Sequence, residues 1–564
     1  MEQLSVGMGE WFFTQGLIGY KTILENYGVK VKTTYDGIIV EKQHLEIMAD
    51  AFFDYYLKVY SVASREERYL RRLHHQFKNG ETTVKKDLNQ RINETKKKVE
   101  KYFSDTEEGL QFIEAANRYR QEKKYDEKLD PLLDQLIESL STKQIDEKLT
   151  ANFFKTTILR SYFGQVSFLN VSKNALTLEE QKAVFYKDFI EPVLVEWALM
   201  DAIEKEDAEE VHKVLNGTNH KIFNSIKSAF KKKTVKEMKD FIQQKVHHCT
   251  FTEFPIALHS FEEGIFTPLA LSLKNVNVTW EAQKTFLPLC SLARLLIFCS
   301  QAGATRSQNK SVFIYYGGTF DALYQTNQFY ADMKNPNKTF DEIVFNLVRE
   351  QKLKADYLTK NHYMIFEFTS DYDSKKTILD YMVMTPFLMK LFSEHGDLFQ
   401  QIHPINRGTF IKYLLQNIDP KHFILNVLRN KIKKGYSALE VIRMIQIRHL
   451  NLLLAKGEEK VESAQQKRYV WALVKSAEEV RRKIGDKKAQ GIAYRLLNAV
   501  RSHNKNTFMD TVMRTYISCD LQMPGILLEA LHEEKMDFAT VGNAWIAGLV
   551  SKPNEIKEGE KTDE

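Results

Sequence analysis

Cysteine and proline are scarce in this sequence. Among its 564 residues there are four cysteines and 11 prolines, and 27% of the residues are charged. The cysteines are far apart and form no C-x-x-C pair, which argues against a disulfide framework and against an ordinary structural zinc site. Few prolines and many charged residues favour helix. The four cysteines are Cys249, Cys290, Cys299 and Cys519.

Long apolar segments are also missing. The most apolar stretch, FLPLCSLARLLIFC at residues 286–299, is shorter than the roughly 20 residues of a membrane-spanning helix, and it contains Arg294. The opening MEQLSVGMGEW lacks the basic segment and apolar run of a secretory signal. We therefore expect a cytoplasmic protein that has no membrane partner.

Familiar catalytic motifs are absent. The sequence contains no Walker A pattern, no G-x-S-x-G, no H-E-x-x-H and no His-Asp dipeptide. His247, His248 and Cys249 form the most metal-like cluster, but no matching second pair of ligands follows it. We expect no active site, no metal and no other cofactor, while the sequence leaves open whether these three residues bind a metal by themselves.

The pattern of apolar residues predicts a mainly α protein with a smaller β component. Residues 10–28 read as a helix, residues 29–43 as a hairpin that turns at Asp36-Gly37, and residues 311–316 and 362–371 as strands. From residue 375 onward we expect helices and no strand. The predicted organisation is an α+β N-terminal domain at 1–374, a C-terminal helical bundle at 375–551, and a disordered charged tail at 552–564.

Positive charge is concentrated in the predicted bundle. Between Lys467 and Arg514 there are twelve Lys and Arg against four Asp and Glu, a net +8, whereas the whole chain carries +6. Near the centre of this segment, Ile492, Leu496 and Val500 share one helical face, while Lys487, Tyr494, Asn498 and Arg501 share another. Cations gathered on one face of a helix indicate a polyanionic partner.

Three stretches resemble one protein family. They are GEWFFTQGLIGYKTILE (9–25), TFLPLCSLARLLIFCSQAGATR with SVFIYYGGTFDALYQTN (285–327), and GIAYRLLNAVRSHNKNTFMDTVMRTYISC with its continuation (491–550). In this order they resemble the large subunit of type I-B CRISPR Cascade complexes, the Cst-one type. Some relatives carry paired cysteines that look like a zinc finger. This chain lacks them, so no metal is carried over.

The resemblance implies a non-catalytic subunit of a guide-RNA-loaded surveillance complex in antiviral defence. In that family the N-terminal domain checks the protospacer-adjacent motif, and the bundle helps to hold the opened DNA strands. The implied partners are guide RNA, target DNA, the Cascade backbone, guide-processing and small subunits, and a helicase-nuclease recruited on target binding. In related complexes the bundle is also made separately from an internal start, for which Met444 or the group Met382, Met384 and Met389 are candidates.

The candidate DNA-binding residues fall into two sets. In the bundle, cations and one aromatic residue are of the types that bind a single nucleic-acid strand. Each arginine is equally explained as a solvated or ion-paired surface residue, and Tyr494 as a packing residue. In the loop at 303–310, polar side chains suit base reading, although a plain connection explains them as well. The bundle set is Arg481, Arg482, Lys483, Lys487, Lys488, Tyr494, Arg495 and Arg501; the loop set is Arg306, Gln308, Asn309 and Lys310.

Two other functions remain open from the sequence. One is a nuclease with an unrecognised active site, and the other is a stand-alone RNA-binding helical protein. Neither is excluded by composition or by the motifs.

Overall fold

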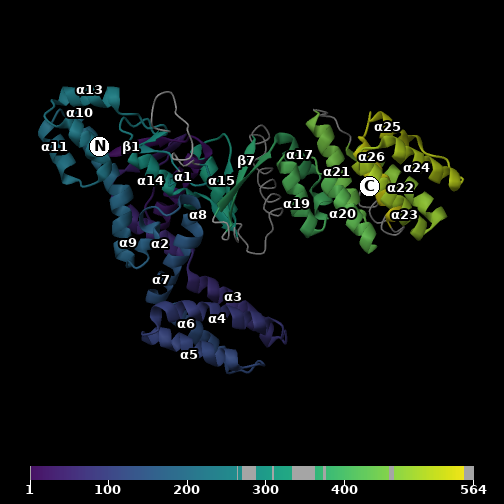
Figure 1. Ribbon diagram of the computed structural model, residues 1–564, viewed down its shortest axis with the longest axis horizontal. Helices are drawn as coiled ribbons and strands as arrows, with labels where there is room; N and C mark the ends of the chain where they lie inside the picture. The colour runs from purple at the N-terminus through teal and green to yellow at the C-terminus, as the bar shows by residue number, and fades with distance from the viewer. Residues whose placement is uncertain are drawn as a thin grey trace. The chain divides into compact units, whose positions relative to one another are not determined.

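A computed structural model describes residues 2–262, 264–269, 287–307, 310–332, 362–371, 376–456 and 463–551 (Figure 1). Within these ranges the protein is mainly α with a small β component, as predicted. The chain divides into two compact units. The first comprises Met1–Phe313, Gly318–Asn327 and Glu367–Asp380, and the second comprises Ile314–Gly317, Gln328–Phe366 and Tyr381–Glu564.

The first unit begins with a small sheet and two packed helices. Strand β1 (Gln3–Gly7) pairs antiparallel with β2 (Gly37–Glu41), and α1 (Trp11–Asn26) and α2 (Lys42–Val59) follow them in the chain. The predicted hairpin at 29–43 forms only as a short turn. The Thr33–Ile38 bridge and a hydrogen bond from the Ile39 amide to the Lys32 carbonyl oxygen, 2.9 Å, join its two arms, whereas β2 pairs along its whole length with β1. Helix α1 lies very close to the 3₁₀ turn η6 (Ser300–Gly303): a Cβ on Gly19 would stand 2.0 Å from the Cys299 carbonyl oxygen.

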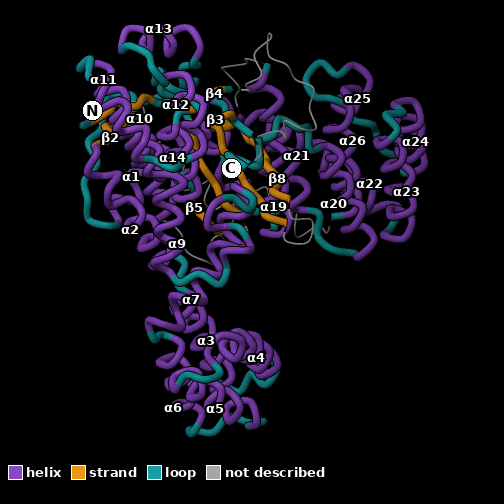
Figure 2. The backbone as a smooth tube through the Cα atoms, turned by 60° about the vertical axis from the view of Figure 1, so that its left-hand side comes forward, coloured by secondary structure: helices purple, strands orange, loops and turns teal. Residues whose placement is uncertain are grey.

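Five charged helices form a subdomain of the first unit with its own apolar core. Their apolar stripes meet, and residues such as Leu70, Ile92, Phe112 and Leu133 are fully enclosed. Figure 2 shows α3 to α6 lying together beyond α7. The helices are α3 (Val62–Lys78), α4 (Val84–Phe103), α5 (Glu107–Gln121), α6 (Leu129–Leu140) and α7 (Lys143–Phe153).

The remainder of the first unit is mostly helical, as expected. Its helices are α8 (Arg160–Phe163), α9 (Leu178–Phe185), α10 (Glu191–Glu204), α11 (Ala208–Gly217), α12 (Asn224–Phe230), α13 (Val235–Lys245) and α14 (Ser291–Phe298). Helix α15 (Phe320–Asp332) begins in the first unit and ends in the second. The short strands β3 (His259–Ser260) and β4 (Pro288–Leu289) pair antiparallel.

A four-stranded sheet follows α14 in the order β5-β6-β7-β8. Strands β6 (Lys310–Tyr315) and β7 (Tyr363–Asp371) confirm the two strands predicted near these positions. Strand β5 (Thr305–Ser307) pairs antiparallel with β6. The expectation of no strand after residue 375 is wrong, because β8 covers Lys376–Met384. Its sequence, KTILDYMVM, has short apolar spacing that suits either a helix or a strand, so local pattern could not decide.

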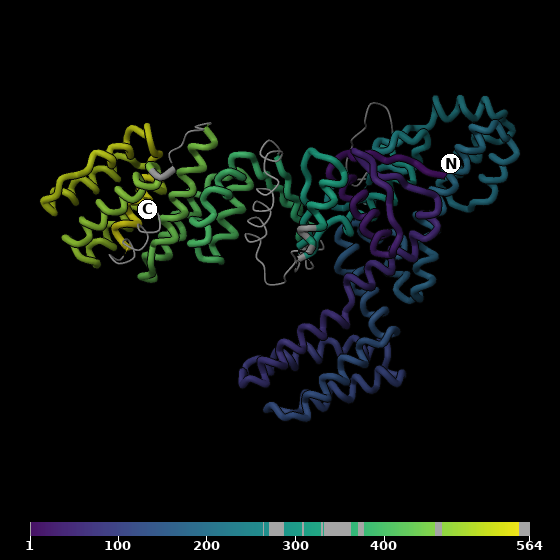
Figure 3. Tube along the Cα trace, turned by 180° about the vertical axis from the view of Figure 1, so that it is seen from behind, coloured from purple at the N-terminus to yellow at the C-terminus, as the bar shows by residue number. Residues whose placement is uncertain are grey.

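The second unit contains the predicted helical bundle. Its green-to-yellow helices pack side by side when seen from behind (Figure 3). The helices are α17 (Pro386–Glu394), α18 (Gly396–Gln400), α19 (Pro404–Leu415), α20 (Lys421–Lys434), α21 (Leu439–Ala455), α22 (Ser463–Ile484), α23 (Asp486–Arg501), α24 (Lys505–Ser518), α25 (Glu529–His532) and α26 (Phe538–Val550).

Helix α26 is the central member of the bundle. It is apolar on nearly all sides, is buried from Phe538 to Leu549, and packs against α20, α21, α22 and α23. Its approach to α22 leaves no space for a side chain at Gly548, where a Cβ would stand 2.2 Å from the Val474 carbonyl oxygen. No helix in the described ranges combines the length and the apolar character that crossing a bilayer requires.

A buried arginine ties three segments of the bundle together. Arg448 on α21 lies 2.7 Å from an Asp419 carboxylate oxygen and 2.9 Å from an Asp537 carboxylate oxygen, and it also donates to Thr540 over 2.8 Å. Asp419 precedes α20, and Asp537 caps the start of α26. Because both carboxylates have this cation as their partner, the arrangement fixes the starts of α20 and α26 relative to α21.

Candidate nucleic-acid interface

Helix α23 has one apolar face and one basic face. It begins after Gly485, whose φ of 76° lets the chain turn sharply out of α22, and it buries Ala489, Ala493, Leu496 and Val500. The helix packs this apolar face against α26 and its neighbours in the bundle. The opposite face is therefore left to solvent.

The solvent side of α23 forms what we call the α23 basic face. Four cations are exposed on it and Tyr494 is half-buried. None of the four makes an ion pair with a described residue, and residues 487–501 contain no Asp or Glu. At 1.5 Å per residue the face is about 21 Å long, the rise of roughly six nucleotides in a stacked strand. The α23 basic face consists of Lys487, Lys488, Tyr494, Arg495, Asn498 and Arg501.

The end of α22 supplies fewer free cations than its sequence suggested. The Nε atom of Arg481 donates to an Asp486 carboxylate oxygen over 3.0 Å, and the arginine side chain is only 12% exposed. Arg482 is exposed but pairs with Glu478 at 2.6 Å. Lys483 is exposed and has no ion pair among the described residues. Of this predicted group, Lys483 is thus the cation best placed to bind an anion, and Arg481 holds the turn between α22 and α23.

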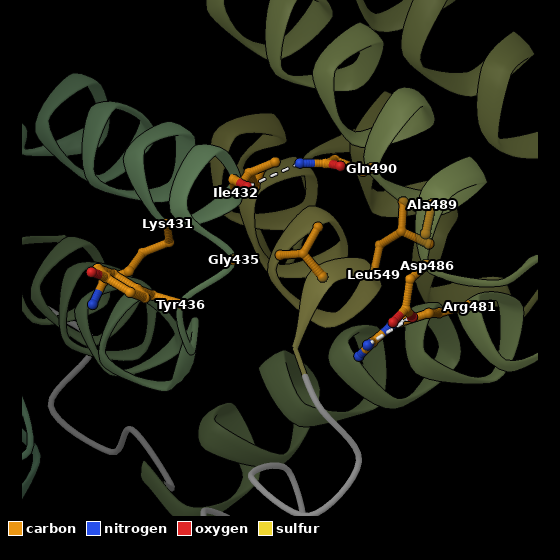
Figure 4. A pocket seen from close by; sticks show the side chains of 10 residues that line it. Lys431, Ile432, Gly435, Tyr436, Arg481, Asp486, Ala489, Gln490 and Leu549 are labelled. Atoms are coloured by element: carbon orange, nitrogen blue, oxygen red, sulfur yellow. Dashed lines mark hydrogen bonds and ion pairs between the residues drawn. The ribbon is translucent and has the colours of Figure 1, made fainter.

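The end of α20 adds residues that sequence reasoning missed. Lys433, Lys434 and Tyr436 are exposed there, and the amide of Gln490 on α23 donates to the Ile432 carbonyl oxygen over 3.1 Å. Figure 4 shows this contact between the two helices, with Tyr436 lying beside Lys431 on one side of a pocket and the Arg481–Asp486 pair on the other. The basic end of α20 and the first turn of α23 are consequently neighbours.

The predicted base-reading loop is largely a β-hairpin. Arg306 lies on β5 opposite Ser311 of β6, half-buried, and burial lowers the pKa of its guanidinium. Lys310 begins β6 and lies 2.8 Å from the carboxylate of Glu367, which is only 3% exposed. Gln308 and Asn309 lie outside the described residues. Arg306 and Lys310 belong to the first unit, whereas the α23 basic face belongs to the second. A base-reading role for this loop stays a prediction.

A row of three hydrogen-bonded side chains in the first unit, Glu196, Ser291 and His259, resembles a catalytic triad in composition. The hydroxyl of Ser291 lies 2.6 Å from a Glu196 carboxylate oxygen and 3.2 Å from Nε2 of His259. In a serine hydrolase the histidine stands between the serine and the acid, whereas here the serine stands between the acid and the histidine. Ser291 is also buried. Its hydroxyl therefore lacks both a suitable base and access to a substrate.

The surroundings of Glu196 and His259 shift the pKa values of both groups. Burial raises the pKa of Glu196 to about 8, although hydrogen bonds from the amide and hydroxyl of Ser291 act in the opposite direction. Burial, together with the nearby Arg294, lowers the pKa of His259 to about 3. At neutral pH both groups are mostly uncharged, as expected for a fully buried carboxyl and for a half-buried imidazole beside a cation.

The three residues of the metal-like cluster have different surroundings. His247 pairs through its backbone with Ala257, His248 is exposed, and Cys249 is buried. Among the residues that the structure describes, no group of three or more His, Cys, Asp and Glu is arranged to hold a metal ion. In comparisons with protein-family models, curated proteins and solved structures, nothing matches this chain.

Proposed function

We propose that this chain is a non-catalytic protein that binds a nucleic-acid strand along the α23 basic face. The observation that carries the proposal is the exposed row of cations on residues 487–501, which contains no acidic residue; the adjacent Asp486 is paired with Arg481 of α22. A strand of phosphates gains from such a row because each contact releases condensed counterions. Tyr494 adds an aromatic surface, which suits the unstacked bases of a single strand.

We further propose that the chain is the large subunit of a type I-B CRISPR Cascade complex in antiviral defence. This finer proposal rests on the ordered resemblance of residues 9–25, 285–327 and 491–550. In it, the first unit recognises the protospacer-adjacent motif, with Arg306 among the candidates, and the helical unit stabilises the opened target DNA. The proposed partners are guide RNA, the other Cascade subunits and a helicase-nuclease, all in the cytoplasm.

A separate product of the helical unit is best started at Met382 or Met384. Both residues lie at the end of β8, before α17, so the product would retain every helix of the bundle. A start at Met389 would lose the first turn of α17, and a start at Met444 would remove α17 to α20 and cut α21 in two. Changing Met382 and Met384 together to Leu should then abolish a short C-terminal product in cells, whereas Met444→Leu should leave it intact. The reverse result would assign the start to Met444.

The binding proposal is tested with purified protein and a labelled 20-nucleotide single strand at a fixed 100 mM salt. The double variant Lys487→Glu, Arg495→Glu should weaken binding strongly, because two attractive contacts become repulsive. Arg514→Glu, a single charge reversal outside the face, is the control and is compared with Lys487→Glu and Arg495→Glu taken singly. Arg514 is exposed on the neighbouring α24 and already pairs with Asp510 at 2.8 Å. Equal binding by wild type and the double variant, with folding intact, would refute the role of the α23 basic face.

The same preparation separates the competing functions. Incubation of duplex and single-stranded DNA with Mg²⁺ or Mn²⁺ should leave both intact, and cleavage that one point mutation removes would establish a nuclease instead. Copurification with backbone subunits and a guide RNA would support the Cascade assignment. Recovery of the chain with heterogeneous cellular RNA and no other subunit would favour a stand-alone RNA-binding protein.

A further inference from the structure

Tyr436 is an exposed aromatic residue on a rigid turn. Gly435 ends α20 in the left-handed conformation, with φ 66° and ψ 28°, and the amide of Tyr436 then donates to the Lys431 carbonyl oxygen over 3.1 Å. The side chain of Tyr436 is nevertheless 59% exposed. The backbone is thus fixed by the helix cap while much of the ring is open to solvent.

Cations surround this ring. The ammonium groups of Lys431 and Lys434 each lie 5.8 Å from the ring centroid. Lys431 is engaged by the carboxylate of Glu440, whereas Lys433 and Lys434 are exposed and make no ion pair with a described residue. Lysines at the C-terminal end of a helix also interact favourably with the helix dipole, but that effect does not require an exposed aromatic ring among them.

The ring stands between two hollows on the surface of the bundle. One is the pocket of Figure 4, and the other, about 390 Å³, is lined by Lys434 and Tyr436 together with His403, Asn406 and Glu440. A hollow of this size lies within the range that holds a small organic group. A flat group placed against the ring would have polar side chains along its edge.

The ring of Tyr436 lies near the first turn of α23, where the α23 basic face begins. Gln490 of α23 contacts the last turn of α20, so the exposed Lys487 and Lys488 start where α20 ends. A strand that follows α23 toward Lys487 therefore passes the Arg481–Asp486 pair and approaches the lysines around Tyr436. Phosphate contacts and an aromatic ring in succession are the usual elements of a surface for single-stranded nucleic acid.

We propose that Tyr436 is a stacking platform for one base of a single strand whose phosphates are bound by Lys433, Lys434 and the α23 basic face. This inference rests on the proposed function and adds to it the site where a base, in addition to the backbone, is held. In this proposal Lys434 leaves the ring for a phosphate on binding, and a base takes its place against the ring. Stacking tolerates every base, so the site adds affinity without selecting sequence.

The test compares three variants on two ligands. The ligands are a fluorescent 12-nucleotide thymidine strand and an abasic strand of equal length, both measured at 100 mM salt. Tyr436→Ala should weaken binding of the thymidine strand by roughly fivefold to 150-fold and leave the abasic strand unchanged. Tyr436→Phe, which keeps the aromatic face, should bind like wild type. Tyr381→Ala removes a tyrosine that is 53% exposed on β8 and should have no effect.

The outcomes distinguish this inference from the function on which it rests. If wild type binds neither strand, the proposed function fails. If wild type binds both strands and Tyr436→Ala matches Tyr381→Ala, the platform is refuted while backbone binding stands. If Tyr436→Ala weakens both strands equally, the residue acts on the backbone and stacking is refuted. If a poly-glutamate peptide binds wild type but not Tyr436→Ala, and both nucleic-acid strands bind the two proteins equally, the surface is assigned to an acidic protein instead. A 2-aminopurine base quenched by wild type and by Tyr436→Phe, but not by Tyr436→Ala, would support stacking directly.

Discussion

Salt dependence gives the sharpest test of the α23 basic face. Its four cations have no ion pairs among the described residues, so each is available for a phosphate. Each phosphate contact on a single strand contributes about −0.7 to the slope of log K against log salt concentration. Four contacts then give a slope of about −2.8, and affinity should fall roughly 50-fold between 50 and 200 mM salt. The double variant Lys487→Ala, Arg495→Ala retains two contacts, for which the same arithmetic gives a slope of about −1.4 and a roughly sevenfold fall.

Fluorescence anisotropy at 50, 100 and 200 mM salt measures both slopes. Cations elsewhere in the second unit make both slopes steeper by the same amount, so the difference of about 1.4 is the quantity that tests the structure. Arg514→Ala should leave the slope unchanged, because Arg514 pairs with Asp510 on α24. A double variant that binds more weakly but keeps the wild-type slope would show that these two residues do not neutralise phosphates.

Three further predictions concern stability. Because the folded protein raises the pKa of Glu196 to about 8, protonation of this carboxyl stabilises the fold; this stabilisation is complete below the unfolded pKa, near 4.5, and is lost as pH rises through 8. In urea unfolding, the free energy of unfolding of the wild type should therefore fall by about 2 kcal/mol between pH 6 and 8, a fall that Glu196→Gln does not show. Arg448→Ala leaves two partly buried carboxylates without their cation and should lower the free energy of unfolding by about 3–5 kcal/mol, and an unchanged thermal midpoint would contradict this. Gly548→Ala should destabilise by about 1–3 kcal/mol because its Cβ meets the Val474 carbonyl, whereas Gly491→Ala, with nothing near its Cβ, should be neutral or stabilising in the same melting experiment.

Local sequence pattern predicted those elements whose own residues define them. The apolar spacing of Leu496 and Val500 predicted the buried face of α23. The start of α24 is likewise local, since the side chain of Asn504 accepts a hydrogen bond from the Thr507 amide over 2.9 Å. Pairing between distant segments was not predictable in this way. Strand β2 finds its partner in β1, more than thirty residues earlier, and β8 is a strand because it lies beside β7.

In the candidate site, too, residues on a single helix were predictable from the sequence, whereas residues brought together by packing were not. The α23 basic face could be read from one helix, because its residues recur at helical spacing. The lysines and Tyr436 at the end of α20 were missed because only packing brings α20 beside α23. Arg481 was included although Asp486 binds it across the turn at Gly485, a spacing that helical i,i+4 rules do not cover.

The contrast between α23 and its neighbours is the strongest argument for function in this bundle. Two exposed arginines on α22 and α24 are matched by acids four residues away, Arg482 by Glu478 and Arg514 by Asp510, while Arg468 near the start of α22 is exposed and has no ion pair with a described residue. Such pairs are a simple way to keep a helix soluble, and they add a few tenths of a kcal/mol each. The α23 basic face has the same solvent exposure but no acid, so its cations repel one another in the free protein. Solubility alone does not require that arrangement, whereas a phosphate strand relieves the repulsion and gains from every cation on the face.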